Sequence, residues 1–150
     1  MTSGYGFGHL LIIWNEANQT GVKILDEQHR AFAAMINTLH YGLVVKQDRH
    51  YLQPCYNMVM GFAKTHFPLE IDMLKEAGYP LAREHQAQHE RFIADSRRIR
   101  HEILHEGRDP EEFLEFLKHW WKVHILRGDL AYSAHLQAYI SSQHRVITKR

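Results

Sequence analysis

Hydrophobic residues recur every three or four positions along most of this chain, which is the spacing of helices with one buried face. The periodic segments predict four helices, over residues 26–45, over 49–76, from 81 to a turn at 107–110, and from 110 to about 128. Asp26 and Asp109 stand where N-caps are expected, and Pro110 suits the first position of a helix. Pro68 lies inside the second segment, where it should bend the helix near Thr65.

The two ends of the chain are predicted to lie outside these four helices. Residues 1–21 contain several glycines and no sustained period, so we expect an irregular arm that packs Leu10, Ile12 and Trp14 onto the helices. The residues after Asp129 predict a short closing helix. Because no segment has a useful β pattern, the predicted fold class is all-α, an antiparallel up-down-up-down four-helix bundle.

Composition narrows the classes of protein to consider. At 150 residues and 45% hydrophobic content, the chain suits one core, which predicts a single domain over residues 1–150. A net charge of +1, with both signs spread along the chain, argues against nucleic acid as a partner. The longest apolar run, Leu10–Trp14, is far below the roughly 20 residues that cross a bilayer, so no membrane insertion is expected. A single cysteine, Cys55, and no recognisable signal peptide favour a cytoplasmic location.

Seven polar residues fall at spacings that could bring them together around two metal ions. They are His29, His66, Glu70, His85, His89, His124 and Asp129. Imidazole and carboxylate groups are donors that first-row metals such as iron accept, and no thiolate is among them. In an antiparallel bundle, the starts of the first and third helices and the ends of the second and fourth lie at one end, and that is where these residues fall.

Spacing along the helices supports most of this set. Residues four apart on an α-helix share a face, as do His66 with Glu70 and His85 with His89. Carboxylates among neutral imidazoles suit two adjacent dications, because bridging anions screen the repulsion between the metals. Taken singly, each histidine is more often a surface or core residue than a ligand, so the prediction depends on their shared layer.

Asp129 does not follow this spacing rule. It comes five residues after His124, a separation that an unbroken α-helix turns away by about 140°. Gly128 directly precedes Asp129, and glycine tolerates the backbone conformations that end a helix. The prediction is therefore a helix break at Gly128 that lets Asp129 turn back toward the other ligands.

Three further histidines serve as comparisons. His101 lies about 160° around its helix from His85, and His119 about 140° from the last predicted ligand histidine, so both should face solvent. His40 returns to the face of the first predicted ligand but lies about 16 Å further along the helix axis, which predicts a core or bundle-end residue.

The candidate ligands belong to longer motifs. These are GVKILDEQHR at 21–30, HFPLEIDM at 66–73, GYPLAREHQAQHERF at 78–92 and WWKVHILRGDLAYSAHL at 120–136. With them the chain, from about Trp14 to Leu136, resembles the hemerythrins, and most closely their single-domain bacterial members, the bacteriohemerythrins.

The resemblance implies a cofactor of two iron ions (Fe2+/Fe3+) with a bridging oxo or hydroxo group. The implied ligands are His85, His89 and His124 for one iron, His29 and His66 for the other, and Glu70 with Asp129 as bridges. The iron with two histidines would keep an open position for dioxygen. The pocket around it should be apolar and lined by Phe67, Trp120, Trp121 and Ile125. Trp121 stands where the family usually has a smaller, leucine-like side chain, which predicts a narrower pocket.

The function implied by the resemblance is reversible dioxygen binding for transport, storage, delivery or sensing, a binding role and not an enzyme activity. Its partners would be dioxygen and an oxygen-using enzyme or a signalling protein. The alternative is a di-iron enzyme that acts as an oxidase, a peroxidase or a nitric oxide handling protein. The sequence suggests no further acid, tyrosine or cysteine in the ligand layer to donate protons or electrons, which favours the binding role.

Overall fold

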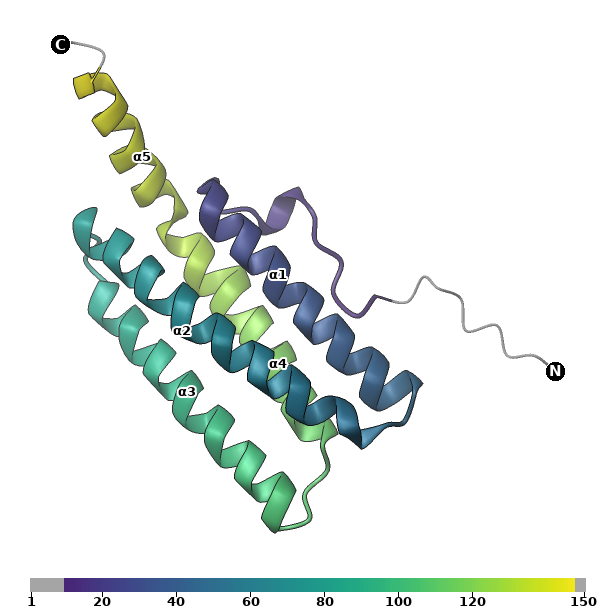
Figure 1. Cartoon of the computed structure of the whole chain (residues 1–150). Coiled ribbons are helices and arrows are strands. Elements are labelled where there is room, and N and C mark those ends of the chain that lie inside the picture. The colour runs from purple at the N-terminus through teal and green to yellow at the C-terminus, as the bar shows by residue number, and fades with distance from the viewer. Residues whose placement is uncertain (1–9, 148–150) are drawn as a thin grey trace.

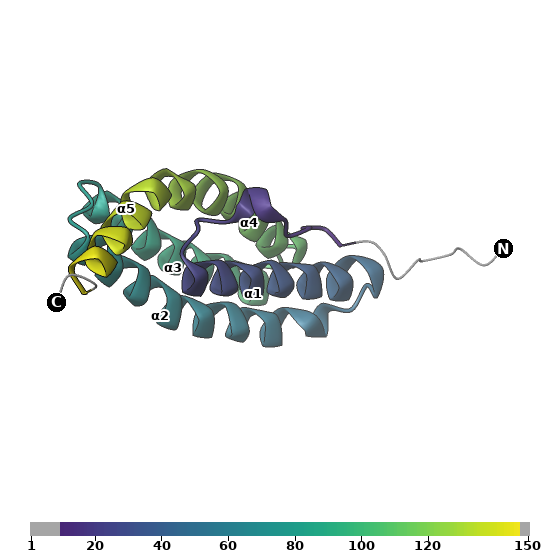
Figure 2. The ribbon, with the colours of Figure 1, turned by 90° about the horizontal axis from the view of Figure 1, so that it is seen from above.

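Four helical segments run antiparallel and pack side by side (Figures 1 and 2). The computed structural model describes residues 10–147, and none of these forms a strand. The α-helices are α1 (Lys23–His40), α2 (Leu52–Glu76), α3 (Ala82–His105), α4 (Glu111–Trp120) and α5 (Leu130–Ile147). Shorter segments are the 3-10 helices η1 (Glu16–Asn18) and η3 (Arg49–Tyr51) and the π-helices η2 (Tyr41–Val45) and η4 (Trp121–Asp129). The all-α bundle predicted from the hydrophobic period is confirmed.

The hydrophobic period of each helix becomes the core of the bundle. On α1, the spaced residues Phe32, Ile36 and Leu39 have no exposed surface. They meet the matching faces of the other helices, for example Val59 on α2 and Leu117 on α4, which are also fully buried. Burying such side chains contributes roughly 1.5–3 kcal/mol each, so these faces hold the helices in register.

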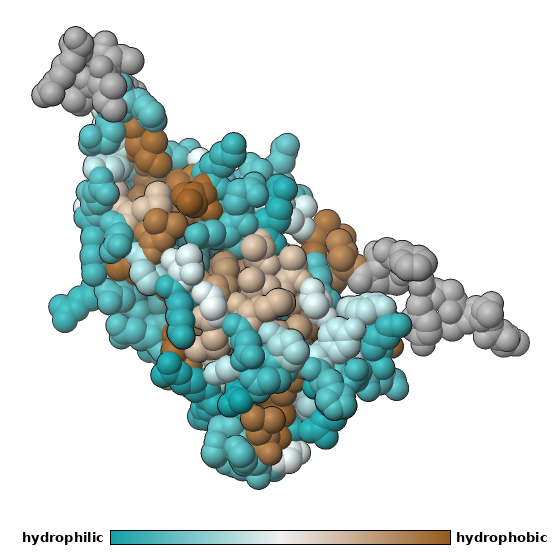
Figure 3. Space-filling view, viewed as in Figure 1, coloured by the Kyte–Doolittle hydropathy of each residue, from teal (hydrophilic) through white to brown (hydrophobic). Residues whose placement is uncertain are grey.

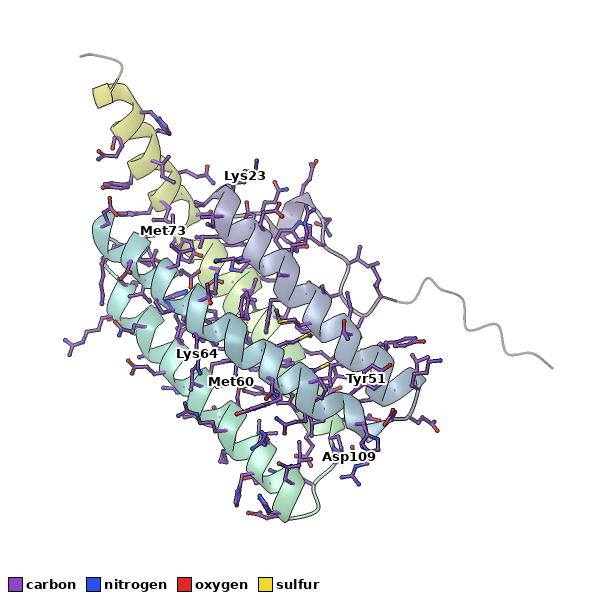
Figure 4. All side chains as sticks on the ribbon, viewed as in Figure 1. Lys23, Tyr51, Met60, Lys64, Met73 and Asp109 are labelled. Carbon is purple, nitrogen blue, oxygen red and sulfur yellow. The ribbon has the colours of Figure 1, made fainter. Side chains whose placement is uncertain are left out.

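The two ends of the bundle can be followed in Figure 4. Lys23 at the start of α1 and Met73 near the end of α2 lie toward one end, whereas Tyr51 and Asp109 lie toward the other. The first end is the one that the predicted ligand layer should occupy. From there α5 continues past the neighbouring helices (Figure 1).

Two details of the helix limits differ from the prediction. The first helix begins at Lys23, so Asp26 lies in its first turn and is not the N-cap. The Asp26 carboxylate instead accepts hydrogen bonds from Thr20 N at 2.7 Å, Thr20 Oγ1 at 2.8 Å and Gly21 N at 3.1 Å. These hydrogen bonds hold residues 20 and 21, which precede the helix, against its first turn. The fourth helix begins at Glu111, so Pro110 is its N-cap and Asp109, predicted as the N-cap, lies one residue earlier. The Asp109 Oδ1 still accepts a hydrogen bond from Glu111 N at 2.9 Å.

The chain does not break at Gly128, and this prediction was wrong. Residues from Trp121 to Asp129 form the π-helix η4, which runs directly into α5. The closing helix is also longer than expected, because α5 has 18 residues. Tyr132 and Leu136 on α5 are buried against the end of the bundle, while its later part has little cover.

The segment before α1 packs as predicted at two of the three expected positions. Ile12 exchanges two backbone-to-amide hydrogen bonds with Asn37, both 2.8 Å long. The Trp14 ring meets the Trp121 ring edge-on at 6.0 Å. Leu10 is 60% exposed, so its expected packing was wrong. Glycines 4, 6 and 8 lie outside the described residues.

The visible surface is mostly hydrophilic, with separate hydrophobic patches (Figure 3). Among residues 10–147, no helix has the length and apolar character needed to cross a membrane.

The Asp26 hydrogen bonds lead to a stability prediction. Asp26→Ala should lower the free energy of unfolding of the metal-free protein by about 1–2 kcal/mol, because three donors lose a charged acceptor. The measurement is chemical denaturation followed by circular dichroism. The denaturant concentration at the midpoint should fall, while the dependence of the unfolding free energy on denaturant concentration (the m-value) stays constant. Glu27→Ala, a neighbouring exposed carboxylate, is the control and should have no effect. Equal effects of the two substitutions would contradict the role assigned to Asp26.

Candidate metal centre

All seven predicted ligand residues lie together in the interior, near one end of the bundle. They are His29 on α1, His66 and Glu70 on α2, His85 and His89 on α3, and His124 and Asp129 on η4. Each is at most 5% exposed. Polar side chains are seldom buried this completely without a partner. The burial of the whole cluster therefore indicates that it binds a ligand or an ion.

The donor atoms form two overlapping groups. Glu70, His85, His89 and His124 make one, and His29, His66, Glu70 and Asp129 make the other. Within each group the donor atoms lie within 4.8 Å of one another, and Glu70 belongs to both. The five histidines thus divide three and two, the same division that the family resemblance implies.

Glu70 is the centre of the first group. Its Oε2 lies 3.0 Å from His85 Nε2, 2.9 Å from His89 Nε2 and 3.8 Å from His66 Nε2. A single carboxylate oxygen therefore faces imidazoles from both α2 and α3. This position suits an anion shared between two cations.

Asp129 faces both groups with different oxygens. Its Oδ2 lies 2.9 Å from His29 Nε2, while its Oδ1 lies 3.0 Å from His85 Nε2 and 3.1 Å from His124 Nε2. The carboxylate thus spans the space between α1 on one side and α3 with η4 on the other. The arrangement resembles that of a bridging ligand.

The π-helix η4 explains how Asp129 reaches this position. A π-helix bonds residue i to residue i+5, so residues five apart come close to eclipsed, as residues four apart do on an α-helix. His124 and Asp129 therefore face inward together without any break at Gly128. Wide turns of this kind are frequent at functional sites.

Several buried donor and acceptor atoms have no hydrogen bond among the described residues. They include His29 Nε2 and both Asp129 oxygens. His29 Nε2 approaches Asp129 Oδ2 at 2.9 Å without hydrogen-bond geometry. An unsatisfied buried polar atom costs roughly 1–3 kcal/mol, and more when it is charged. A cation between these atoms would satisfy all of them, so the residues present fit a metal centre.

Two glutamines orient ligand rings, and the sequence analysis did not identify them. The Oε1 of Gln28 lies 2.7 Å from His66 Nδ1, and the Oε1 of Gln88 lies 2.7 Å from His124 Nδ1. An amide oxygen can only accept, so each Nδ1 donates and each Nε2 keeps its lone pair toward the centre. Each glutamine directly precedes a predicted ligand in the sequence but serves a histidine of another helix, so its role is not visible from spacing.

Tyr132 also belongs to the ligand layer, contrary to the expectation that no tyrosine would lie there. Its side chain has no exposed surface, its hydroxyl donates a hydrogen bond to Glu70 Oε1, and its ring meets that of His85 edge-on. Burial, reinforced by the charges of Asp129 and Glu70, raises the pKa of Tyr132 well above its usual value. The phenol therefore keeps its proton and holds the second oxygen of Glu70.

The charges of the centre depend on one another. Burial alone would raise the pKa of Glu70, but hydrogen bonds from His85 and His89 outweigh it and lower this pKa to about 2. Burial opposes protonation of His85, yet Asp129 and Glu70 raise its pKa to about 9. Burial lowers the pKa of His66 to about 4. Without a metal, a proton on His85 thus offsets part of the carboxylate charge.

Aromatic rings cover three of the imidazoles. Phe67 stacks on His89 with a centroid distance of 3.9 Å, and Trp120 stacks on His124 at 3.8 Å. Phe62, which the sequence analysis did not single out, stacks on the ring of His66 at 4.8 Å. These rings exclude water from the faces of the imidazoles and restrict their rotation.

The two other residues predicted to line an oxygen pocket are buried in the adjoining core. Trp121 packs its ring against Trp14 and Phe32, at 6.0 and 6.5 Å between centroids. Ile125 is 2% exposed and belongs to the same cluster.

The comparison histidines lie where helical geometry predicted. His101 and His119 are exposed, and His40 is half-buried at the end of α1. High histidine content therefore does not by itself place an imidazole in the centre.

Comparison with known proteins gives a consistent assignment. Residues 20–135 match the family described as the Hemerythrin HHE cation binding domain. A bacteriohemerythrin of Stenotrophomonas maltophilia is 30% identical over 134 residues, covering 87% of this chain and 85% of the relative. A bacteriohemerythrin of Pseudomonas paraeruginosa is 29% identical over 124 residues, covering 81% and 78%.

A solved structure agrees in fold. The crystal structure of a hemerythrin mutant superposes with a TM-score of 0.74 at 23% identity, covering 85% of this chain and 98% of that one. Because the family match spans most of the chain, including all seven residues of the cluster, the chain belongs to the hemerythrin family.

Proposed function

We propose that this protein binds dioxygen reversibly at a centre of two iron ions held by the seven buried side chains. The observation that carries the proposal is the pair of donor groups that share Glu70. His85, His89 and His124 would hold one iron, and His29 with His66 the other. Glu70 and Asp129 would bridge them, together with an oxo or hydroxo group.

The chemistry that two ferrous ions supply is the reversible donation of electrons to dioxygen. The residues of this chain would orient the metal ligands, hold a proton in place and keep water away from the centre. Gln28 and Gln88 present the Nε2 atoms of two histidines toward the centre, and the Tyr132 hydroxyl keeps a proton directed at Glu70 Oε1. Phe67 and Trp120 keep bulk water from the imidazole faces. We propose that Trp121 and Ile125 also line the oxygen pocket and exclude water from it.

A second candidate function has one observation in its favour. Tyr132 is a buried phenol in contact with the ligand layer, and such a group could donate a proton or an electron in an oxidase, a peroxidase or a nitric oxide handling enzyme. Its raised pKa and its bond to Glu70 fit a positioning role better. Reversible binding therefore stands first, serving transport, storage, delivery to an oxygen-using enzyme, or sensing through a partner.

The ligand assignment predicts metal content. His124→Ala should bind about one iron per chain instead of about two, because one iron loses an imidazole that no neighbour replaces. Iron analysis after anaerobic reconstitution gives the ratio. His101→Ala, an exposed histidine on α3, should bind as much as the unmodified protein. Circular dichroism of the metal-free variants separates ligand loss from misfolding, and full iron content in a folded His124→Ala protein would refute the assignment.

The raised pKa of His85 predicts how metal affinity changes with pH. Metal binding requires the deprotonated imidazole, and with a pKa of about 9 His85 carries a proton at neutral pH. Loading should therefore release about one proton from His85, and affinity should rise about tenfold per pH unit from about pH 7 to pH 8.5. Competition with a chelator of known iron affinity measures this slope under anaerobic conditions. An affinity independent of pH would contradict it.

Oxygen binding itself predicts a reversible spectrum. Reduced, iron-loaded protein exposed to air should gain a charge-transfer absorption in or near the visible range, and the band should disappear under argon over repeated cycles. Tyr132→Phe should keep the band, because the phenol positions Glu70 and does not react. One-way conversion to a ferric form without the band, together with oxygen consumption that needs Tyr132, would favour the enzyme.

A further inference from the structure

A surface groove between α3 and the α4–η4 segment lies next to the metal centre and has no assigned role. We propose that this groove binds a small organic anion with a planar apolar body and a carboxylate or sulfonate group. The groove has a volume of about 600 Å³, within the roughly 300–1,000 Å³ of small-molecule sites. The proposal goes beyond oxygen binding, and His124 is the one predicted metal ligand among the residues that line the groove.

The floor of the groove is aromatic. The Phe92 ring stacks on Phe116 at 5.2 Å and packs against Trp120 at 4.5 Å. Phe116 and Trp120 are only half-buried, and Val123 beside them is 45% exposed. These side chains therefore offer apolar surface to an occupant, which a planar ring would cover by stacking.

The two sides of the groove carry positive charge without an internal counter-ion. Arg91 on α3 and Arg127 on η4 are both exposed, and neither makes an ion pair or side-chain hydrogen bond among the described residues. The carboxylate in the groove, Asp95, is paired with Arg98 at 3.2 Å. Guanidinium groups recognise carboxylates and sulfonates through paired N–H donors, so the complementary head group is an anion.

The inner end of the groove reaches the metal centre at His124, Trp120 and Gln88. His124 itself lines the groove, and Trp120, which lines it too, stacks on the His124 ring at an angle of 13°. Gln88, which also lines the groove, accepts the His124 Nδ1 hydrogen at 2.7 Å. Beside them, Gly128 has no side chain to narrow the space. An occupant would therefore lie beside Trp120, Gln88 and the predicted metal ligand His124.

Shape and charge favour a small molecule over the other occupants. A neutral apolar compound would leave both arginines unused, and a nucleic acid would need a wider basic surface than a chain of net charge +1 offers. A ring with one anionic group satisfies the aromatic floor and the arginines together.

The test is calorimetric titration of the folded, iron-loaded chain with 2-naphthoate as the probe. Saturable binding is expected at one site per chain, at least tenfold tighter than binding of uncharged 2-naphthalenemethanol. Arg91→Gln combined with Arg127→Gln should weaken the binding of 2-naphthoate at least tenfold and leave the binding of the uncharged compound unchanged. Arg97→Gln, an exposed arginine on α3 outside the groove, is the matched control and should change neither.

A second measurement locates the site without using the iron. In the metal-free protein, 2-naphthoate should shift the indole N–H resonance of Trp120 and leave that of Trp121 unchanged, because only Trp120 lines the groove. The proposal fails if no saturable binding occurs, if both naphthalene compounds bind equally, or if the Arg97→Gln control weakens binding as much as the double variant. Such failure would leave the oxygen-binding proposal intact, because the groove residues tested are not metal ligands.

Discussion

Two ionised carboxylates without any exposed surface, Glu70 and Asp129, lie among imidazoles in the interior of a hydrophobic bundle, near one of its ends. Burying such charges costs several kcal/mol each unless positive charge or strong donors surround them. Five histidines from four helical segments meet this requirement, partly by sharing a proton at His85 when no metal is bound. The helices must keep their register, because a shift of one residue would take a ligand out of the layer and expose a carboxylate to apolar side chains.

This requirement also accounts for the irregular helix in the structure. Asp129 reaches the cluster because η4 winds as a π-helix across the segment that contains both His124 and Asp129. A π-helix packs its backbone less favourably than an α-helix, so it persists where tertiary contacts compensate. Here the electrostatic attraction between the Asp129 carboxylate and protonated His85, whose Nε2 lies 3.0 Å from Asp129 Oδ1, provides part of that compensation in the metal-free protein.

Contacts between helices also set the chemistry around the ligands. Gln28 and Gln88 fix the tautomers of histidines on neighbouring helices, and Tyr132 reaches Glu70 from α5. The same neighbours connect the centre with the outside, because Gln88 and Trp120 belong to both the ligand surroundings and the α3–α4 groove. His124 itself also lines this groove.

The sequence by itself determined the helices, their antiparallel order and the seven candidate ligands. Periodicity places His66 with Glu70 and His85 with His89 on single faces, and burial follows from the hydrophobic residues around them. Only the tertiary structure decided that Asp129 arrives through a π-helix and not through a break at Gly128, and that Tyr132 and the two glutamines complete the layer. The physical reason is that helical period records which face of one helix is buried, whereas these features depend on which atom of a different helix lies opposite.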